Sequence, residues 1–135
     1  MTTEFELYIP GTTKDLLGAI EILAEHEINL DTIAARRVVG DKYVLRFVTG
    51  LEEECRRTFI KADLPFKERK VLLIELSNRP GQWLRAARHL VSEGVELEGS
   101  YLLSQSNGTM RFVFAVDDYE KAKKVACQVS NCSAD

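Results

Sequence analysis

A candidate ligand-binding loop lies within residues 77–84, which read Ser-Asn-Arg-Pro-Gly-Gln-Trp-Leu between a strand-like apolar run and a helix-like stretch. Gly81 carries no Cβ, so its backbone can approach a ligand closely, and Pro80 fixes the entry to the helix. Amides in the first turn of a helix have no partner within it, and here they belong to Gln82, Trp83 and Leu84. With Arg79 or Asn78 as an additional side-chain donor, this junction favours the binding of a carboxylate.

An alternative interpretation needs no ligand. A Pro-Gly pair is ordinary turn chemistry at a strand–helix junction, and Asn78 and Arg79 are then solvated side chains. Trp83 then fills core space beneath the helix. If a ligand does bind, the indole either blocks the pocket or selects a smaller ligand.

The remaining reactive side chains show no catalytic grouping. His26 and His89 have no evident nucleophile or metal partner, and Ser77 and Ser92 lack the sequence context of a nucleophile elbow. The acidic run 52–54 is explained by the positive end of a helix rather than by a metal. We therefore expect no enzyme activity, no metal and no cofactor.

Composition and charge indicate a folded protein of the cytoplasm. The chain has 135 residues, a net charge of −3 and 45% hydrophobic residues. The acidic balance argues against nucleic acid as a partner, and the apolar runs are too short to span a membrane. The cysteines are Cys55, Cys127 and Cys132, and without a Cys-x-x-Cys pair we expect them to be reduced thiols.

A repeat of 67 positions organises the chain. With this offset and no gaps, apolar positions of the first half fall on apolar positions of the second half, with matched pattern rather than matched letters. Phe5, Leu7 and Ile9 fall on Leu72, Ile74 and Leu76, and Tyr43, Leu45 and Phe47 fall on Met110, Phe112 and Phe114. We therefore expect two repeats, residues 1–70 and residues 71–135.

Each repeat reads strand, helix, strand, strand, helix. In the first repeat, strands are expected at 5–9 and 42–48, and residues 27–30 are expected to lead into a further strand that runs to about Val39. A helix capped by Thr12 with Asp15, a Gly40-Asp41 hairpin turn and a helix at 51–62 complete the repeat. In the second repeat, Asp117 is expected to cap the last helix. One long strand, 66–76, is expected to end the first repeat and begin the second.

The expected fold class is therefore α+β, with two ferredoxin-like βαββαβ repeats whose antiparallel sheets carry helices on one face. The second repeat is expected to lack its last strand, because the counterpart of Phe66 is Ser133. Neither strand–helix loop contains the cysteines of a metal carrier. The outward residues of strand 42–48 are Val44, Arg46 and Val48, with no aromatic side chain for stacking RNA bases.

The second repeat resembles an ACT domain, a regulatory module that binds amino acids in many metabolic proteins. Three segments carry the resemblance: 73–81 (LIELSNRPG), 90–97 (LVSEGVEL) and 112–122 (FVFAVDDYEKA). The resemblance implies that a ligand lies between the loop at residues 78–81 and the start of the second strand of a neighbouring domain. The partner residues there would be Glu96 and Leu97, or Asn29 and Leu30, with Glu96 facing an ammonium. In the first repeat Lys14 replaces Gly81.

The resemblance implies a non-catalytic, allosteric regulator that binds an amino acid at ACT domain interfaces. The alternative is an ACT-like scaffold that dimerises, or docks on a metabolic enzyme or regulator, without a small-molecule ligand. A homodimer or larger homo-oligomer is expected because the outer faces of the sheets are apolar and one sheet edge is left open. The outer-face residues are Val44, Val48, Val71, Leu73, Val113 and Ala115.

Overall fold

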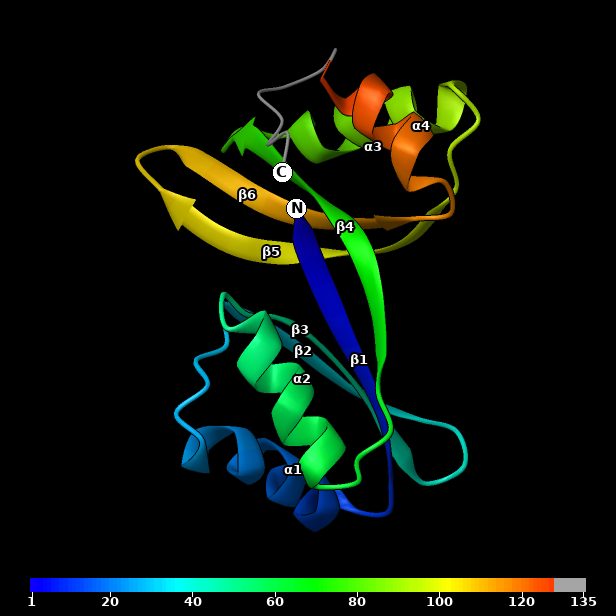
Figure 1. The fold of residues 1–135 in the computed structure, drawn as a ribbon. Coiled ribbons are helices and arrows are strands. Elements are labelled where there is room, and N and C mark those ends of the chain that lie inside the picture. The colour runs from blue at the N-terminus through cyan, green and yellow to red at the C-terminus, as the bar shows by residue number, and fades with distance from the viewer. Residues whose placement is uncertain (128–135) are drawn as a thin grey trace. The chain divides into compact units, whose positions relative to one another are not determined.

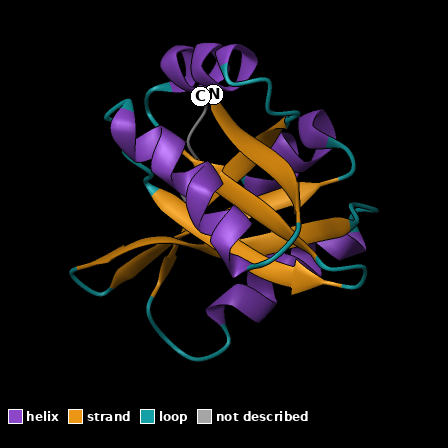
Figure 2. Cartoon of the chain, turned by 90° about the horizontal axis from the view of Figure 1, so that it is seen from below, coloured by secondary structure: helices purple, strands orange, loops and turns teal. Residues whose placement is uncertain are grey.

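The computed structural model describes residues 1–127, which form an α+β fold with six strands and four helices (Figures 1 and 2). In chain order the elements are β1 (Thr2–Pro10), α1 (Thr13–Glu25), β2 (Thr32–Val38), β3 (Lys42–Val48), α2 (Glu52–Lys61), β4 (Lys67–Ser77), α3 (Gln82–Ser92), β5 (Leu97–Ser106), β6 (Thr109–Val116) and α4 (Tyr119–Ala126). The chain divides into two compact units. The N-terminal unit is Thr3–Arg69, and the C-terminal unit is Met1–Thr2 with Lys70–Asp135.

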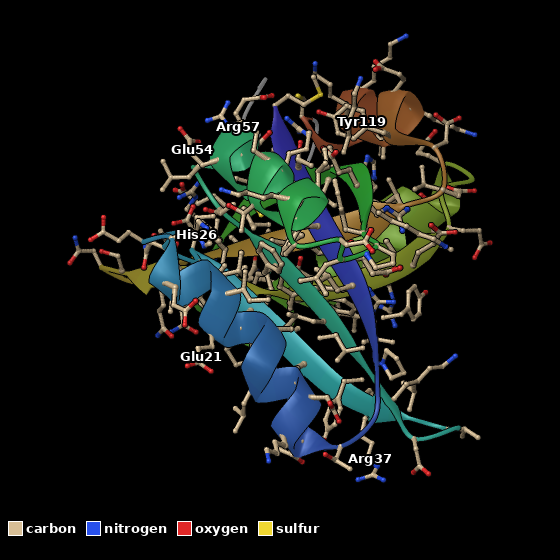
Figure 3. The ribbon with its side chains drawn as sticks, turned by 60° about the horizontal axis from the view of Figure 1, so that its bottom comes forward. Glu21, His26, Arg37, Glu54, Arg57 and Tyr119 are labelled. Carbon is tan, nitrogen blue, oxygen red and sulfur yellow. The ribbon has the colours of Figure 1, made fainter. Side chains whose placement is uncertain are left out.

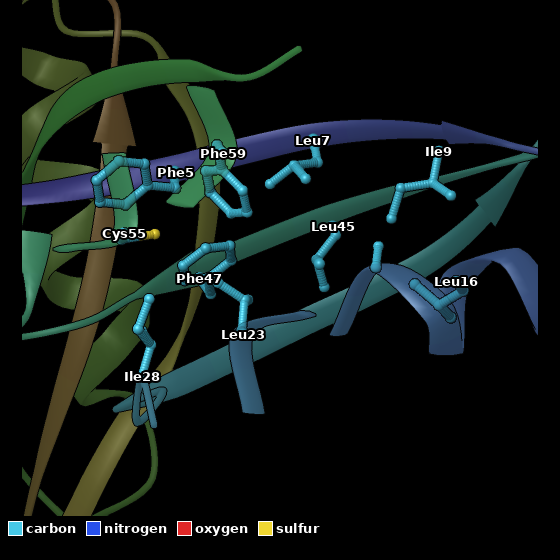
Figure 4. Close-up of a cluster of buried hydrophobic side chains, with 11 residues drawn as sticks. Phe5, Leu7, Ile9, Leu16, Leu23, Ile28, Leu45, Phe47, Cys55 and Phe59 are labelled. Atoms are coloured by element: carbon cyan, nitrogen blue, oxygen red, sulfur yellow. The ribbon is translucent and has the colours of Figure 1, made fainter. Parts of the chain in front are cut away.

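The strands of the N-terminal unit pair antiparallel in the order β2-β3-β1, and α1 and α2 cover one face (Figure 1). Alternation in β1 sends Phe5, Leu7 and Ile9 to that face, where all three are buried. Four phenylalanines pack against one another there, with ring centroids 5.3–6.2 Å apart: Phe5, Phe47, Phe59 and Phe66. Figure 4 shows this core with side chains from both helices.

Two predictions of local structure in this unit are confirmed, the helix cap at Thr12 and the hairpin turn at Gly40 and Asp41. The backbone N–H of Thr12 donates to the Asp15 carboxylate at 2.8 Å, which is one half of a capping box at the start of α1. Gly40 and Asp41 both have positive φ, 92° and 51°, and they lie in the three-residue hairpin loop 39–41 that joins Val38 of β2 to its register partner Lys42 of β3. β2 begins at Thr32, so Asn29 and Leu30 lie in the loop that leads into it.

The strands of the C-terminal unit pair antiparallel in the order β4-β6-β5. Leu72, Ile74 and Leu76 of β4 are buried in a core completed by α3, α4 and β6. β4 is continuous from Lys67 to Ser77, which confirms the long strand expected across the join.

The cap of the last helix is one residue later than expected. Asp118, not Asp117, precedes α4, and its carboxylate accepts from the Lys121 backbone N–H at 3.1 Å. Asp117 instead accepts the Glu96 backbone N–H at 3.0 Å. Both aspartates can accept from a backbone N–H, so sequence alone did not distinguish them.

The apolar residues expected on the outward faces of the sheets have low exposed fractions. The exposed fractions are 8% for Val44, 5% for Val48, 1% for Val71, 0% for Val113 and 3% for Ala115. These low exposed fractions leave the predicted homo-oligomer untested.

Three further expectations concern the missing last strand, the cysteines and membrane-spanning segments. The missing last strand involves Ser133, which lies outside the described residues. Cys127 is disulfide-bonded, so the prediction of reduced thiols is wrong there, while Cys55 is a buried free thiol. Among the described helices none is long and apolar enough to cross a membrane.

Candidate functional site

The loop between β4 and α3 is held by short backbone hydrogen bonds. The Asn78 N–H donates to the Gly108 carbonyl at 2.7 Å, and the Arg79 N–H donates to the Ser77 carbonyl at 2.8 Å. Gly81 is the N-cap of α3, with φ of 83°, a conformation that an L side chain adopts at a cost. A Cβ built at Gly81 meets no atom within 4 Å, so the space beside the loop is open.

The start of α3 presents backbone donors that have no acceptor in the part of the chain that the structure describes. The Gln82 N–H makes a long bond of 3.4 Å to the Arg79 carbonyl, and the Arg85 N–H makes the first helical bond, to Gly81, at 2.9 Å. Between them, the N–H groups of Trp83 and Leu84 have no acceptor within residues 1–127. The first turn of α3 contains no acidic residue, so its partial positive charge is not offset locally.

The corresponding helix of the N-terminal unit is different. At α1 the carboxylate of Asp15 accepts the Thr12 N–H at 2.8 Å. Lys14, which stands where the repeat alignment places Gly81, is itself inside the helix. An acid of the chain therefore already occupies the position that a ligand carboxylate would take.

Trp83 joins the loop to the sheet of its own unit. Its indole Nε1 donates to the Ser100 hydroxyl at 3.0 Å, and its ring stacks on Phe114 with centroids 5.8 Å apart. The side chain is still 37% exposed. Trp83 therefore packs on the core, as one interpretation expected, and also forms a surface beside the start of α3.

Sequence analysis missed Ser100 and Phe114. The available signal was the indole N–H, which needs an acceptor when the ring is packed against a protein. Ser100 lies in β5, opposite Phe114 in the strand register, but nothing local in the sequence singles it out.

The other loop side chains are at the surface. Arg79 and Asn78 are exposed, as is Pro80, and the Arg79 Nε donates only a long bond of 3.3 Å, to Ser77. Among the described residues Arg79 has no ion pair, so its guanidinium is available beside the loop. Gln82 accepts from Arg85 at 3.3 Å.

Glu96 and Leu97 do not meet the loop within their own unit. Ser77 pairs with Thr109 at one end of β6, and Leu97 pairs with Val116 at the other end. At about 3.4 Å per residue this is a separation of roughly 24 Å along the strand. Leu97 packs against the core, whereas the Glu96 side chain is exposed.

Asn29 and Leu30 belong to the N-terminal unit and have structural contacts there. The Asn29 carbonyl accepts the Thr49 hydroxyl at 2.6 Å, and Leu30 packs against the core. The Asn29 side chain is exposed.

A separate groove of about 340 Å³ lies between α1 and α2. Its lining residues are His26, Glu54, Arg57, Thr58 and Lys61, of which Figure 3 labels three. The His26 ring bonds to the Ile22 carbonyl at 2.8 Å, so the histidine serves as part of the end of α1. No cluster of residues suited to holding a metal occurs in the described part of the chain.

No family profile matches this sequence, and no curated protein does. The α+β fold is nevertheless shared with solved structures, among them regulatory subunits of aspartate kinase. The protein BT0572 from Bacteroides thetaiotaomicron matches with a TM-score of 0.85 at 20% identity, over 95% of this chain and 88% of that one.

Two aspartate kinase regulatory subunits also match. The subunit from Thermus thermophilus, in its ligand-free form, gives a TM-score of 0.65 at 15% identity, over 95% of this chain and 91% of that chain. The subunit from Thermus flavus gives 0.61 at 14% identity, with the same coverage. At identities this low, the structural likeness shows that the fold is shared and nothing further.

Proposed function

We propose that the chain is a regulatory protein that binds the carboxylate of a free amino acid at the start of α3 and catalyses no reaction. The observation that carries the proposal is the pair of unaccepted N–H groups at Trp83 and Leu84. They stand beside the open space at Gly81, and the first turn contains no acidic residue. Helix starts of this kind bind carboxylates through their amides and their partial positive charge.

Selectivity for an amino acid needs an acceptor for its ammonium as well. Exposed Glu96 is a suitable group, but it lies at the far end of β6 in the same unit. We therefore propose that a second copy supplies Glu96, or the backbone at Asn29 and Leu30, to each loop. The fold shared with regulatory subunits of aspartate kinase supports this reading.

The proposed homo-oligomer uses the end strands. β2 and β5 stand at the ends of the strand order, and each carries one exposed large apolar residue: Ile33 at 44% and Leu102 at 42%. An open strand edge with apolar side chains favours pairing with another chain. We propose that the two repeats are residues 1–70 and 71–135 and that the protein acts in the cytoplasm. Ligand binding would then change how the copies associate.

Thermal unfolding with a panel of amino acids tests the function. A ligand that binds only the folded chain at 100 times its Kd adds about 2.7 kcal/mol of stability, so one amino acid should raise the midpoint in a saturable way. The matched control is the amide of the same amino acid, which lacks the carboxylate and should give no shift. A panel that leaves the midpoint unchanged at millimolar concentrations would reject amino-acid binding.

A second candidate function is an ACT-like scaffold that docks on a metabolic enzyme without a small ligand. The observation that favours it is the exposed apolar side of α3, where Leu84 is 46% and Val91 is 54% exposed. Replacing both by serine would abolish such docking while leaving the midpoint shift with an amino acid intact.

A further inference from the structure

The groove between α1 and α2 has both signs of charge in its wall. Its volume is about 340 Å³, and its lining residues, all in the N-terminal unit, are His26, Glu54, Arg57, Thr58 and Lys61. This volume lies within the range of small-molecule sites, in which a few polar groups fix the orientation of the ligand. Thr58 is only 7% exposed and its hydroxyl donates to the Glu54 carbonyl at 2.7 Å, so the other four side chains are the groups that would recognise a ligand.

Three of the lining side chains follow one another along α2 at steps of about one helical turn. Glu54 comes first, Arg57 is three residues later, and Lys61 is four residues after Arg57. Residues at this spacing lie on one face of a helix, with Cβ atoms about 5–6 Å apart. The groove therefore has an acidic position followed by two basic positions along its length.

The two cations are not neutralised within residues 1–127. Lys61 has no carboxylate within ion-pair distance there, and the Arg57 Nη2 lies 3.9 Å from the Glu54 carboxylate, which is beyond hydrogen-bonding distance. The neighbouring Arg56 differs, because it donates to both carboxylate oxygens of Glu68. Arg57 and Lys61 are consequently the arginine and the lysine of α2 that remain available to an anion.

The end of α1 supplies the opposite polarity. His26 is the C-cap of α1, and the last turn of this helix contains no basic residue, so its partial negative charge is not offset locally. The His26 Nδ1 bonds to the Ile22 carbonyl at 2.8 Å. Since a carbonyl oxygen only accepts, Nδ1 carries the proton of the neutral ring, and Nε2 is an acceptor. His26 and Glu54 together therefore favour an ammonium group.

We propose that this groove binds a dicarboxylic amino acid such as glutamate, with its ammonium at Glu54 and His26. The two carboxylates of the ligand bind Arg57 and Lys61 by charge-assisted hydrogen bonds. Such a ligand has two negative groups and one positive group, the reverse of the two cations and one carboxylate in the wall. The site is independent of the one proposed at α3, because none of its residues belongs to the C-terminal unit.

The second repeat has no equivalent set of side chains. The alignment with an offset of 67 places Glu93 at the position of His26 and Lys121 at the position of Glu54. The acid on the second helix is thus replaced by a lysine. The order of charges along the groove is therefore a feature of the first repeat rather than a property of the fold.

Calorimetric titration of the full chain with glutamate tests the proposal. Saturable binding is expected, weakened about tenfold or more by Arg57→Gln and by Lys61→Gln, since each removes one charge-assisted contact. Glutamine lacks the second carboxylate and should bind the wild-type chain about tenfold more weakly. Two control variants should retain this binding: Lys14→Gln, which removes the same charge from the other end of α1, and Gly81→Asp, which alters the site proposed at α3.

Glutarate, which is glutamate without the amino group, tests the ammonium contact. Glu54→Gln should weaken glutamate about tenfold but should not weaken glutarate, because the removed charge attracts only the ammonium. The proposal is overturned if glutamate gives no saturable heat, or if glutamine binds as tightly as glutamate. It is also overturned if Lys14→Gln weakens binding as much as Lys61→Gln, if Gly81→Asp abolishes it, or if Glu54→Gln weakens glutarate as much as glutamate.

Discussion

Replacing Gly81 by aspartate is the sharpest perturbation of the proposed amino-acid site. The substitution places a carboxylate at the N-cap of α3, next to the N–H groups of Trp83 and Leu84. We expect the Gly81→Asp protein to fold and to lose amino-acid binding. Gly81→Asn is the matched control, because it has nearly the same shape without the charge.

The cost to folding is small for two reasons. The added Cβ has open space, so the penalty is that of the left-handed backbone at φ of 83°, about 1 kcal/mol. An acid at a helix start regains about 0.3–1 kcal/mol. The free energy of unfolding should therefore fall by no more than about 1 kcal/mol, or a few degrees in the midpoint.

The cost to binding is much larger. Two carboxylates about 5 Å apart repel by about 3 kcal/mol at an effective dielectric constant of about 20. This corresponds to a loss of more than a hundredfold in affinity, measurable by calorimetry with the amino acid that the wild-type chain prefers. Equal binding by the aspartate and asparagine variants would refute a carboxylate seat at this helix start.

Three other outcomes follow from the cores and from Trp83. Phe59→Ala should lower the free energy of unfolding by about 3–5 kcal/mol in denaturant titrations, because Phe59 is 0% exposed among other aromatic rings. Ser100→Ala should cost only about 0.5–1 kcal/mol, since the partly exposed Trp83 indole can donate to water, and indole fluorescence should shift to the red. Burial raises the pKa of the Cys55 thiol to about 12. Because the unfolded thiol ionises near about 8.5, stability should fall as pH rises above that value, and a thiol reagent should label Cys55 only in unfolded chains.

Local patterns in the sequence predicted the elements well. Alternation of apolar residues identified β1 and β3, since a half-buried strand has a period of two. β4 was predicted because residues 66–76 contain no glycine, proline or asparagine that would break a strand. The turn at Gly40 and Asp41 was predictable because few residue pairs adopt positive φ together.

Contacts that depend on tertiary packing were not predictable. The bond from Trp83 to Ser100 joins residues 17 positions apart in neighbouring elements, and no periodicity encodes it. The burial of Val71 and Val113 was likewise not predictable, because a valine on a strand can be buried or exposed and its residue type does not distinguish the two. The location of the candidate loop was predicted, but the composition of its walls was not.

The position of the bound carboxylate is the most direct test of the account. We would titrate isotope-labelled protein with the preferred amino acid and follow the backbone amide resonances by NMR. The account predicts that the Trp83 and Leu84 amides move most, in a saturable way, and that the resonances of α1 around Thr12 do not. Saturable shifts elsewhere, with these two amides unmoved, would contradict a carboxylate site at the start of α3.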